Sequence, residues 1–491
     1  MPLDAVTLDD KYRLESGRVF ITGTQALVRL PMMQRHRDLA AGLNTACYVT
    51  GYRGSPLGGV DLAMWQARKF LKENHIQFQP GVNEDLAATA VWGSQQLDLF
   101  GDSKYDGVFS MWYGKGPGVD RSGDVLRHGN LAGTAKHGGV LLLAGDDHTC
   151  KSSTTAHQSE YAFMDAGIPV LNPAGVQEFL DMGLYGWAMS RYSGCWIAFK
   201  VVAETVDSTA SCYVDPHRID IRIPDDYAMP PEGLNIRWPQ SSFASAQALE
   251  QEMRLHKHKL YAALAFARAN KLNRVVMDSP KRRFGIVTCG KSYLDVRQAL
   301  DDLGIDEAHA AEIGLVVYKV GMTWPLEPQG VQAFVEGLEE ILIVEEKREL
   351  IEYQLKQQIF NWDEKRRPIV VGKYDENRNR LLPSPWKSLP KSRPRKRRRI
   401  ASSNSSNNSN SSNGQQRKRL LLRRPQRKLP RLLARRPLPK RRNPLRSPRL
   451  KLRKLKKIRG RPSGRSSAPT AAKRLPTASG RSTPLLLKRW P

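Results

Sequence analysis

The 491-residue sequence contains little cysteine, and its thiols form no closely spaced pair. The five cysteines are scattered, and no CxxC or CxxxC motif occurs: they are Cys47, Cys150, Cys195, Cys212 and Cys289. This spacing excludes a disulfide framework, a structural zinc knuckle and a ferredoxin-type cluster built by this chain alone. Reduced thiols in such a pattern are typical of a cytoplasmic protein, so that is the location we expect.

Long apolar runs are also missing. No stretch reaches the roughly 18 apolar residues that a membrane-spanning helix needs, so no membrane association is predicted. The segment Met1–Glu15 does not combine a basic start with an apolar stretch. The sequence therefore does not predict a signal peptide.

Acidic residues are absent from the C-terminal part of the chain. Residues 381–491 hold 36 Lys and Arg and no Asp or Glu. The first 380 residues hold 42 basic and 48 acidic residues, a net charge of −6, although the whole chain carries +30. The high isoelectric point thus describes the C-terminal segment and does not make the remainder a nucleic-acid binder.

The basic segment has low complexity. Seven of the residues in Lys391–Arg399 are basic, and Ser402–Asn413 contains only Ser and Asn. Such a composition cannot bury enough apolar surface to offset the entropy of ordering. We therefore expect a disordered basic tail over 384–491, with nonspecific nucleic-acid binding as its one foreseeable interaction.

Short apolar runs alternate with helical stretches between residues 19 and 220. Several of these runs are apolar throughout, which is typical of parallel strands covered by helices on both faces. Glycine-rich or polar loops follow them, and open α/β sheets bind ligands at those carboxyl ends. We expect a doubly wound parallel sheet over 15–223, with strands at Val19–Thr22, Thr45–Thr50, Phe78–Val82, Gly107–Trp112, Gly139–Ala144, Ile168–Leu171 and Cys195–Val202.

A second α/β unit is expected after a linker. Residues 224–282 combine a Pro- and acid-rich stretch with a helical connector at about 242–272. The second unit then spans 283–376, with helices at about 293–303, 329–338 and 350–361. Its expected strands are Phe284–Thr288, Ile313–Lys319, Glu340–Val344 and Pro368–Val371.

Two motifs stand at ends of the expected strands. Gly51-Tyr52-Arg53-Gly54-Ser55-Pro56 supplies a glycine-lined loop with a hydroxyl group, and Gly81-Val82-Asn83-Glu84 places a carboxylate at a helix start. Because carboxyl ends of parallel strands share one edge, we expect Glu84 to lie near this loop. A tight turn and a helix-start acid would explain the same residues without any function.

Longer blocks resemble the 2-oxoacid:ferredoxin oxidoreductases, most of all the fused bacterial indolepyruvate ferredoxin oxidoreductases. The blocks are GYRGSPLGGVD, GVNEDLAATAVWGSQQ, YGKGPGVDRSGD, LLLAGDDHTCKSSTTAHQSE and VYKVGMTWPLEP. The resemblance covers residues from about 10 to 375. It implies a thiamine-diphosphate domain of the pyrimidine-binding type, followed by a smaller domain similar to the transketolase C-terminal domain.

The resemblance implies oxidative decarboxylation of aryl 2-oxoacids such as indolepyruvate to the acyl-CoA, with electrons passed to ferredoxin. Glu84 matches the carboxylate that contacts pyrimidine N1′ of thiamine diphosphate and so promotes removal of the C2 proton. Gly51, Gly54, Ser55 and Pro56 match the cofactor-binding loop. Ser55 matches a small hydroxyl residue near the substrate carboxylate, and Arg53 stands where the family usually has proline. Arg53 is therefore either a carboxylate ligand or a surface charge.

Other polar residues near strand ends have plainer explanations. Loop hydrogen bonding is the expected task of Arg121, Asp146, Asp147 and His148, and no metal site is expected from His148 and Cys150. Glu345 and Glu346 follow a strand, and we expect them to form a solvated cluster beside Lys347 and Arg348 rather than an acid–base pair.

The second half of a thiamine site is missing from the sequence. No Gly-Asp-Gly motif for the diphosphate and its Mg²⁺ occurs, and neither do the cluster cysteines of the family. Iron–sulfur clusters, Mg²⁺ and coenzyme A are thus expected of the intact enzyme only, and the chain is expected to be an N-terminal fragment, inactive alone and homo-oligomeric. We expect the tail to be a frameshift product; a genuine basic tail is the alternative. The competing hypothesis is a degenerate α/β module whose tail binds nucleic acid or anionic surfaces.

Overall fold

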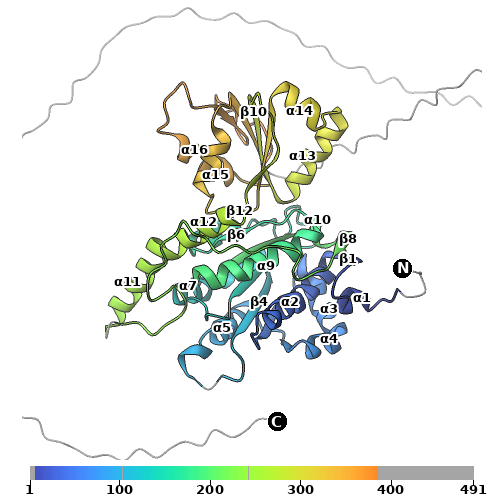
Figure 1. Cartoon of the computed structure of the whole chain (residues 1–491), viewed down its shortest axis with the longest axis vertical. Helices are drawn as coiled ribbons and strands as arrows, with labels where there is room; N and C mark the ends of the chain where they lie inside the picture. Colours follow the sequence, from blue (N-terminus) through green and yellow to red (C-terminus); the bar gives the residue numbers. More distant parts are fainter. Residues whose placement is uncertain (1–5, 102, 241–242, 385–491) are drawn as a thin grey trace, which may run out of the picture. The chain divides into compact units, whose positions relative to one another are not determined.

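The computed structural model describes residues 6–101, 103–240 and 243–384, and these form α/β structure around two main sheets (Figure 1). The tail expected over 384–491 lies outside the described residues except for Ser384. Within the described part, no helix is both long and apolar enough to cross a membrane. All five cysteines are free thiols.

The first sheet has seven strands in the order β12-β6-β7-β5-β4-β2-β3. Six of these strands, all except β12, run parallel to one another, as expected. They are β2 (Ala46–Gly51), β3 (Ile76–Phe78), β4 (Val108–Lys115), β5 (Val140–Asp146), β6 (Val170–Leu171) and β7 (Ile197–Val202).

Alternate residues of the central strands serve two separate hydrophobic cores. Leu141 and Leu143 of β5 face one core, whereas Leu142 and Ala144 face the other. This explains why the sequence of β5 is apolar throughout. One core packs against α2 (Gly23–Ala40), α3 (Val60–Gln66), α4 (Arg68–Glu73) and α9 (Val176–Ser193); the other packs against α5 (Glu84–Ser94), α6 (Gly116–Arg121), α7 (Gly123–Ala132) and α8 (Glu160–Asp165).

The expected strand at Val19–Thr22 forms, but the sheet assigned to it was wrong. This strand, β1 (Arg18–Thr22), pairs antiparallel with β8 (Thr209–Tyr213) in a separate two-stranded ribbon. Its residues alternate between exposed and buried, and Phe20 is 72% exposed. A strand buried on one face only suits the rim of the domain and not the interior of a parallel sheet. The short helix α1 (Asp10–Arg13) precedes β1 in the chain, and the short helix α10 (Ala203–Val206) precedes β8.

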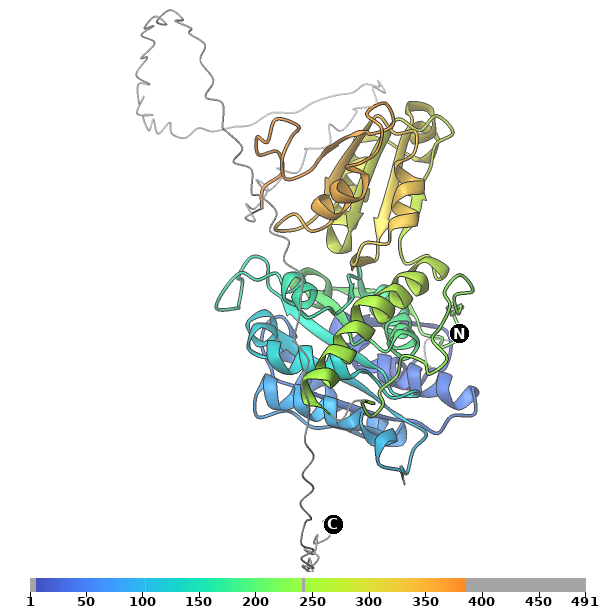
Figure 2. The ribbon, with the colours of Figure 1, turned by 90° about the vertical axis from the view of Figure 1, so that its left-hand side faces the viewer.

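The connector forms two helices, α11 (Ala244–Arg254) and α12 (Leu260–Ala269), joined by a π-helical turn at Leu255–Lys259. The yellow-green segment in Figure 2 is this connector, and α12 packs on α9. The chain then enters the second sheet earlier than expected, because β9 (Arg274–Met277) pairs antiparallel with β11 (Leu315–Val320). The boundaries at 223 and 282 remain a prediction.

The second sheet has five strands in the order β14-β13-β10-β11-β9. Helices α13 (Gly290–Leu303) and α14 (Glu307–Ile313) cover one face, and α15 (Pro328–Val335) and α16 (Ile351–Ile359) cover the other (Figure 1). The expected strands are confirmed as β10 (Phe284–Cys289), β11, β13 (Glu340–Val344) and β14 (Ile369–Val371). Three-residue β12 (Met322–Trp324) was not predicted, and it pairs with β6 of the first sheet.

Candidate functional site

The Gly51–Pro56 loop crosses the carboxyl edge of the first sheet. Gly51 ends β2 so close to β4 that a Cβ atom would lie 2.1 Å from the carbonyl oxygen of Tyr113. The amide of Tyr52 donates to that same oxygen at 3.0 Å. Only glycine allows this approach, because any side chain would overlap the neighbouring strand. Further along, Pro56 and Leu57 pack against Gly145 at the end of β5.

Ser55 and Arg53 differ in how the loop holds them. The Ser55 hydroxyl is hydrogen-bonded to the hydroxyl of Ser152 in the loop that follows β5. Arg53 is exposed, and none of the acids in the described ranges forms an ion pair with it. The serine is therefore held at the sheet edge by a side-chain contact, whereas the Arg53 side chain lies in solvent.

Glu84 is a buried carboxylate at the first position of α5. Asn83 caps this helix, accepting a hydrogen bond from the Leu86 amide at 2.9 Å. Glu84 is only 5% exposed and lies against Gly118 of α6. No described group donates a hydrogen bond to its carboxylate, although its backbone carbonyl accepts one from Trp112 Nε1 at 3.1 Å. The carboxylate oxygens are not fully enclosed, so they remain open to a bound group.

The loop and the carboxylate meet as the motif spacing predicted. The Gly81 amide, three residues before Glu84, donates to the Gly51 carbonyl at 2.8 Å. Both segments follow neighbouring strands, β2 and β3. The expected position of Glu84 beside the loop is confirmed, while the roles given to Gly51, Gly54, Ser55, Pro56, Arg53 and Glu84 stay predictions.

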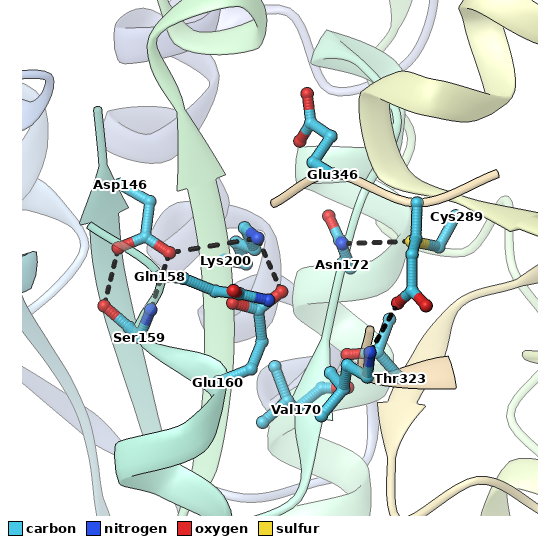
Figure 3. Close-up of polar contacts among 12 residues, drawn as sticks. Asp146, Gln158, Ser159, Glu160, Val170, Asn172, Lys200, Cys289, Thr323 and Glu346 are labelled. Atoms are coloured by element: carbon cyan, nitrogen blue, oxygen red, sulfur yellow. Dashed lines mark hydrogen bonds and ion pairs between the residues drawn. The ribbon is translucent and has the colours of Figure 1, made fainter. Parts of the chain in front are cut away.

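Sequence reasoning missed a buried ionic cluster behind this edge (Figure 3). Lys200 of β7 pairs with Glu160 of α8 at 2.5 Å and lies 3.9 Å from Asp146 at the end of β5. Burial opposes the charged lysine, but the carboxylates of Glu160 and Asp146 raise its pKa overall. The block LLLAGDDHTCKSSTTAHQSE contains both acids, Asp146 and Glu160. The lysine that pairs with Glu160 lies 40 residues further along the chain, so the block by itself did not reveal the pair.

Asp146 does more than the loop hydrogen bonding expected of it. Its carboxylate accepts the amide and hydroxyl of Ser159 at 2.9 and 2.6 Å. Burial alone would raise the pKa of Asp146, but His157, Lys200 and Ser159 lower it well below the usual range. Asp147 does behave as expected, since it accepts the amides of three loop residues, Lys151, Ser152 and Ser153.

The prediction that Glu345 and Glu346 form a solvated cluster was wrong. The Glu345 carboxylate is buried and caps α16 by accepting the amides of Leu350, Ile351 and Glu352. Burial raises its pKa to about 7. Glu346 pairs with buried His148 at 3.1 Å, which lowers the Glu346 pKa although burial opposes this. Packing of this turn on the first sheet removes both acids from water.

The remaining candidates form local contacts. Arg121 pairs with Asp85 at 3.0 Å on the surface. His148 Nδ1 donates to the His157 carbonyl at 2.9 Å, and the Cys150 thiol lies beside the Ser153 carbonyl. Across residues 6–101, 103–240 and 243–384, no three His, Cys, Asp or Glu side chains are grouped to share a metal ion.

A solved structure with a similar fold is 2-oxoglutarate:ferredoxin oxidoreductase from Magnetococcus marinus with 2-oxoglutarate, coenzyme A and succinyl-CoA bound. The TM-score is 0.53 at 14% identity, over 72% of this chain and 62% of that chain. At this identity the likeness concerns the fold. It places the chain in the α/β architecture of a 2-oxoacid:ferredoxin oxidoreductase, which confirms the predicted fold class.

Sequence comparisons are more specific. The family model of the indolepyruvate ferredoxin oxidoreductase middle domain matches residues 273–404. Indolepyruvate oxidoreductase subunit IorA of Methanothermobacter marburgensis is 24% identical over 352 residues, 71% of this chain and 50% of that protein. The same subunit of Archaeoglobus fulgidus is 22% identical over 346 residues, 70% of this chain and 49% of that protein. In sequence, the chain is thus similar to the indolepyruvate ferredoxin oxidoreductases.

The chain spans about half the length of the curated relatives it matches. The matched range of the family model begins one residue before β9 and extends beyond Ser384. It therefore reaches past residue 375, where we expected the resemblance to end.

Proposed function

We propose that the described part of the chain supplies the pyrimidine-ring half of a thiamine-diphosphate site in a 2-oxoacid:ferredoxin oxidoreductase. The reaction of the whole enzyme would be oxidative decarboxylation of an aryl 2-oxoacid such as indolepyruvate to its acyl-CoA, with electrons going to ferredoxin. The observation that carries the proposal is Glu84, a buried carboxylate with no hydrogen-bond donor from the described residues, beside the Gly51–Pro56 loop.

Bound thiamine diphosphate would supply a carbon centre that stabilises the carbanion left by decarboxylation. Glu84 fits this cofactor because its carboxylate is open to a bound group and no described residue donates a hydrogen bond to it. Its task would be to hold a proton at the pyrimidine ring nitrogen N1′ and exchange it with that atom. Gly118 supports this position, because a Cβ there would lie 2.6 Å from Glu84 Oε1.

The substrate carboxylate would lie on the loop side of Glu84. Ser55 offers a hydroxyl there once it exchanges its bond to Ser152 for one to the substrate. Arg53 is exposed and unpaired with described acids, so its guanidinium is available for a bidentate contact with a carboxylate. Gly54 lets the loop approach the Lys115 side chain closely, since a Cβ on residue 54 would lie 2.7 Å from that side chain.

This sequence contains no Gly-Asp-Gly motif. The diphosphate and its Mg²⁺ would therefore be held by a partner. Large apolar side chains beside the site support a partner surface, because Val82 is 81% exposed and Leu86 is 54% exposed. These residues flank Glu84 on the rim of the sheet. The proposed partner is thus the diphosphate-binding domain of the same enzyme, with the iron–sulfur clusters and coenzyme A site elsewhere in the assembly.

The test is proton exchange at C2 of thiamine diphosphate. The full chain is mixed with the remaining C-terminal half of an intact family member and compared with its Glu84→Gln variant. Glu84→Gln should slow exchange by roughly two to four orders of magnitude, the usual loss with a general acid–base group. The matched control is Asp85→Asn, since Asp85 is the next residue and pairs with Arg121 on the surface.

Asp85→Asn should retain the wild-type exchange rate. Equal rates for Glu84→Gln and wild type would remove Glu84 from the proposed role. The chain alone should give no exchange above that of free cofactor, because it lacks the diphosphate half. Catalysed exchange by the chain alone would contradict the half-site proposal.

A further inference from the structure

A pocket of about 500 Å³ lies on the side of α6 away from Glu84. Two glycines of this helix mark its two sides: Gly118 faces Glu84, and a Cβ on Gly116 would lie 2.2 Å from the His157 ring. We name it the Arg348 pocket. The lining residues that matter here are Asp120, His157, Gln158, Tyr161, Lys347 and Arg348.

Arg348 is held in place without an acidic partner. Its guanidinium lies over the Tyr161 ring, 3.9 Å from the centroid, and its Nε donates to Gln158 Oε1 at 3.3 Å. The Arg348 amide donates to the same oxygen at 3.1 Å. None of the described acids forms an ion pair with it, and neither terminal Nη atom is hydrogen-bonded within the described ranges. A stacked guanidinium with two free terminal nitrogens is prepared for a planar or tetrahedral anion.

Two further cations line the same pocket. Lys347 donates to the His148 carbonyl at 2.7 Å, which places its ammonium group at the wall. His157 lies between two carboxylates, with Nε2 2.7 Å from Asp120 Oδ2 and Nδ1 3.4 Å from Asp146 Oδ1. Burial lowers the pKa of His157, but these two contacts outweigh it and raise the pKa above the ordinary value.

The charge balance of the pocket favours an anion. Asp120 is the acid on the wall, and its carboxylate is already engaged by His157. Asp146 lies behind His157, fully buried and also engaged. Lys347 lies near Glu346, Asp146 and Asp147, whereas Arg348 carries a positive charge with which no acid in the described ranges forms an ion pair.

We infer that the Arg348 pocket binds a small anion bearing a carboxylate or phosphate group. Arg348 would bind two of its oxygens through Nη1 and Nη2, and the Lys347 ammonium group would contribute a further N–H donor. This site is distinct from the Glu84 site and does not depend on the proposed function. The volume of the pocket accommodates a small metabolite around the anionic group.

Hydrogen exchange of the full chain tests this inference locally. Exchange is measured with increasing inorganic phosphate in one series and malonate in another, at constant ionic strength. Either anion should slow exchange in peptides covering 156–162 and 345–351 in a saturable manner. The basic tail also attracts anions, but its contribution is the same in every variant and falls in other peptides.

Three variants complete the test. Arg348→Leu should weaken the protection at least tenfold, and Arg348→Lys should weaken it less, because a lysine keeps the charge but loses bidentate geometry. Arg367→Leu is the matched control, since Arg367 is exposed and its guanidinium donates to the Phe360 carbonyl. It should bind as wild type does.

Each outcome decides the inference. Protection by phosphate alone identifies a phosphorylated ligand, and protection by malonate alone identifies a carboxylate. No saturable protection in these peptides, or equal protection in wild type and both Arg348 variants, would overturn the proposal. Thermal unfolding of each variant shows whether a loss of protection comes from a loss of fold.

Discussion

Gly118 leaves no room for a side chain beside Glu84: a Cβ atom on residue 118 would lie 2.6 Å from both Cγ and Oε1 of the glutamate. The helix α6 thus approaches α5 only because residue 118 has no side chain. The position of the Glu84 carboxylate is set by this contact together with its place at the start of α5.

Gly118→Ala should therefore displace the Glu84 carboxylate. We expect a loss of about 1–3 kcal/mol in unfolding free energy, as for other overpacked sites, and a loss of C2 exchange in the complemented enzyme. The control is Gly123→Ala in α7, where no atom lies within 4 Å of the new Cβ. That variant should be as stable as wild type or more stable, because alanine favours a helix. Unchanged exchange in Gly118→Ala would show that the carboxylate position does not matter.

Lys200→Met should be strongly destabilising. The substitution leaves Glu160 and Asp146 buried without their shared cation, and breaking a buried pair in this way typically costs about 3–5 kcal/mol. Chemical denaturation at neutral pH measures the loss. Lys151→Met is the comparison, since Lys151 lies 3.9 Å from Asp207 and both side chains are largely exposed. Its cost should stay within about 1 kcal/mol.

Lys259 should make stability depend on pH above neutrality. It is buried and donates to the carbonyls of Asn130 and Leu131, both at 3.1 Å. Burial lowers its pKa to about 7 from 10.5. Between these values the unfolded chain binds a proton that the folded chain does not, so the unfolding free energy should rise with pH from about 7 to about 10.

Lys259→Met should flatten this part of the stability–pH profile. Lys257→Met should leave it unchanged, because Lys257 is exposed on the same π-helical turn. Denaturation curves at several pH values between 7 and 10 measure the slope for each protein. A slope that persists in Lys259→Met would assign the dependence to other groups.

Nucleic-acid binding, if it occurs, should depend on the basic segment. Residues 381–491 carry 36 basic residues and no acid, whereas the first 380 have a net charge of −6. A chain ending at Glu376 should lose its DNA affinity. The full chain should show a steep fall in affinity with salt, because binding by such a segment releases counterions. Retention of affinity by the shorter chain would locate binding in the α/β part.

The parallel strands and the place of Glu84 could be predicted from the sequence. Runs such as Val140–Ala144 are apolar throughout because two cores contact alternate residues, and this pattern is visible without the fold. Parallel strands bring their carboxyl ends to one edge, so Gly51 and Glu84 could be placed together from their order alone.

Short edge strands could not be predicted in this way. The three residues of β12 carry too little pattern, and their pairing with β6 depends on the second sheet region lying against the first. The exposed residues of β1 likewise show a half-buried strand but do not identify β8 as its partner.

By itself the sequence determined which segments are strands, the edge where their loops gather and the absence of a Gly-Asp-Gly motif, because these depend on local pattern and chain order. Tertiary structure alone decided which charges lie in water. Glu346 meets His148, and Lys347 meets the His148 carbonyl 199 residues away. Such contacts bury Glu345 and Glu346 and leave Arg348 over Tyr161 without an acidic partner in the described ranges. Burial and pairing arise from surfaces that come together only on folding, and no spacing along the chain encodes them.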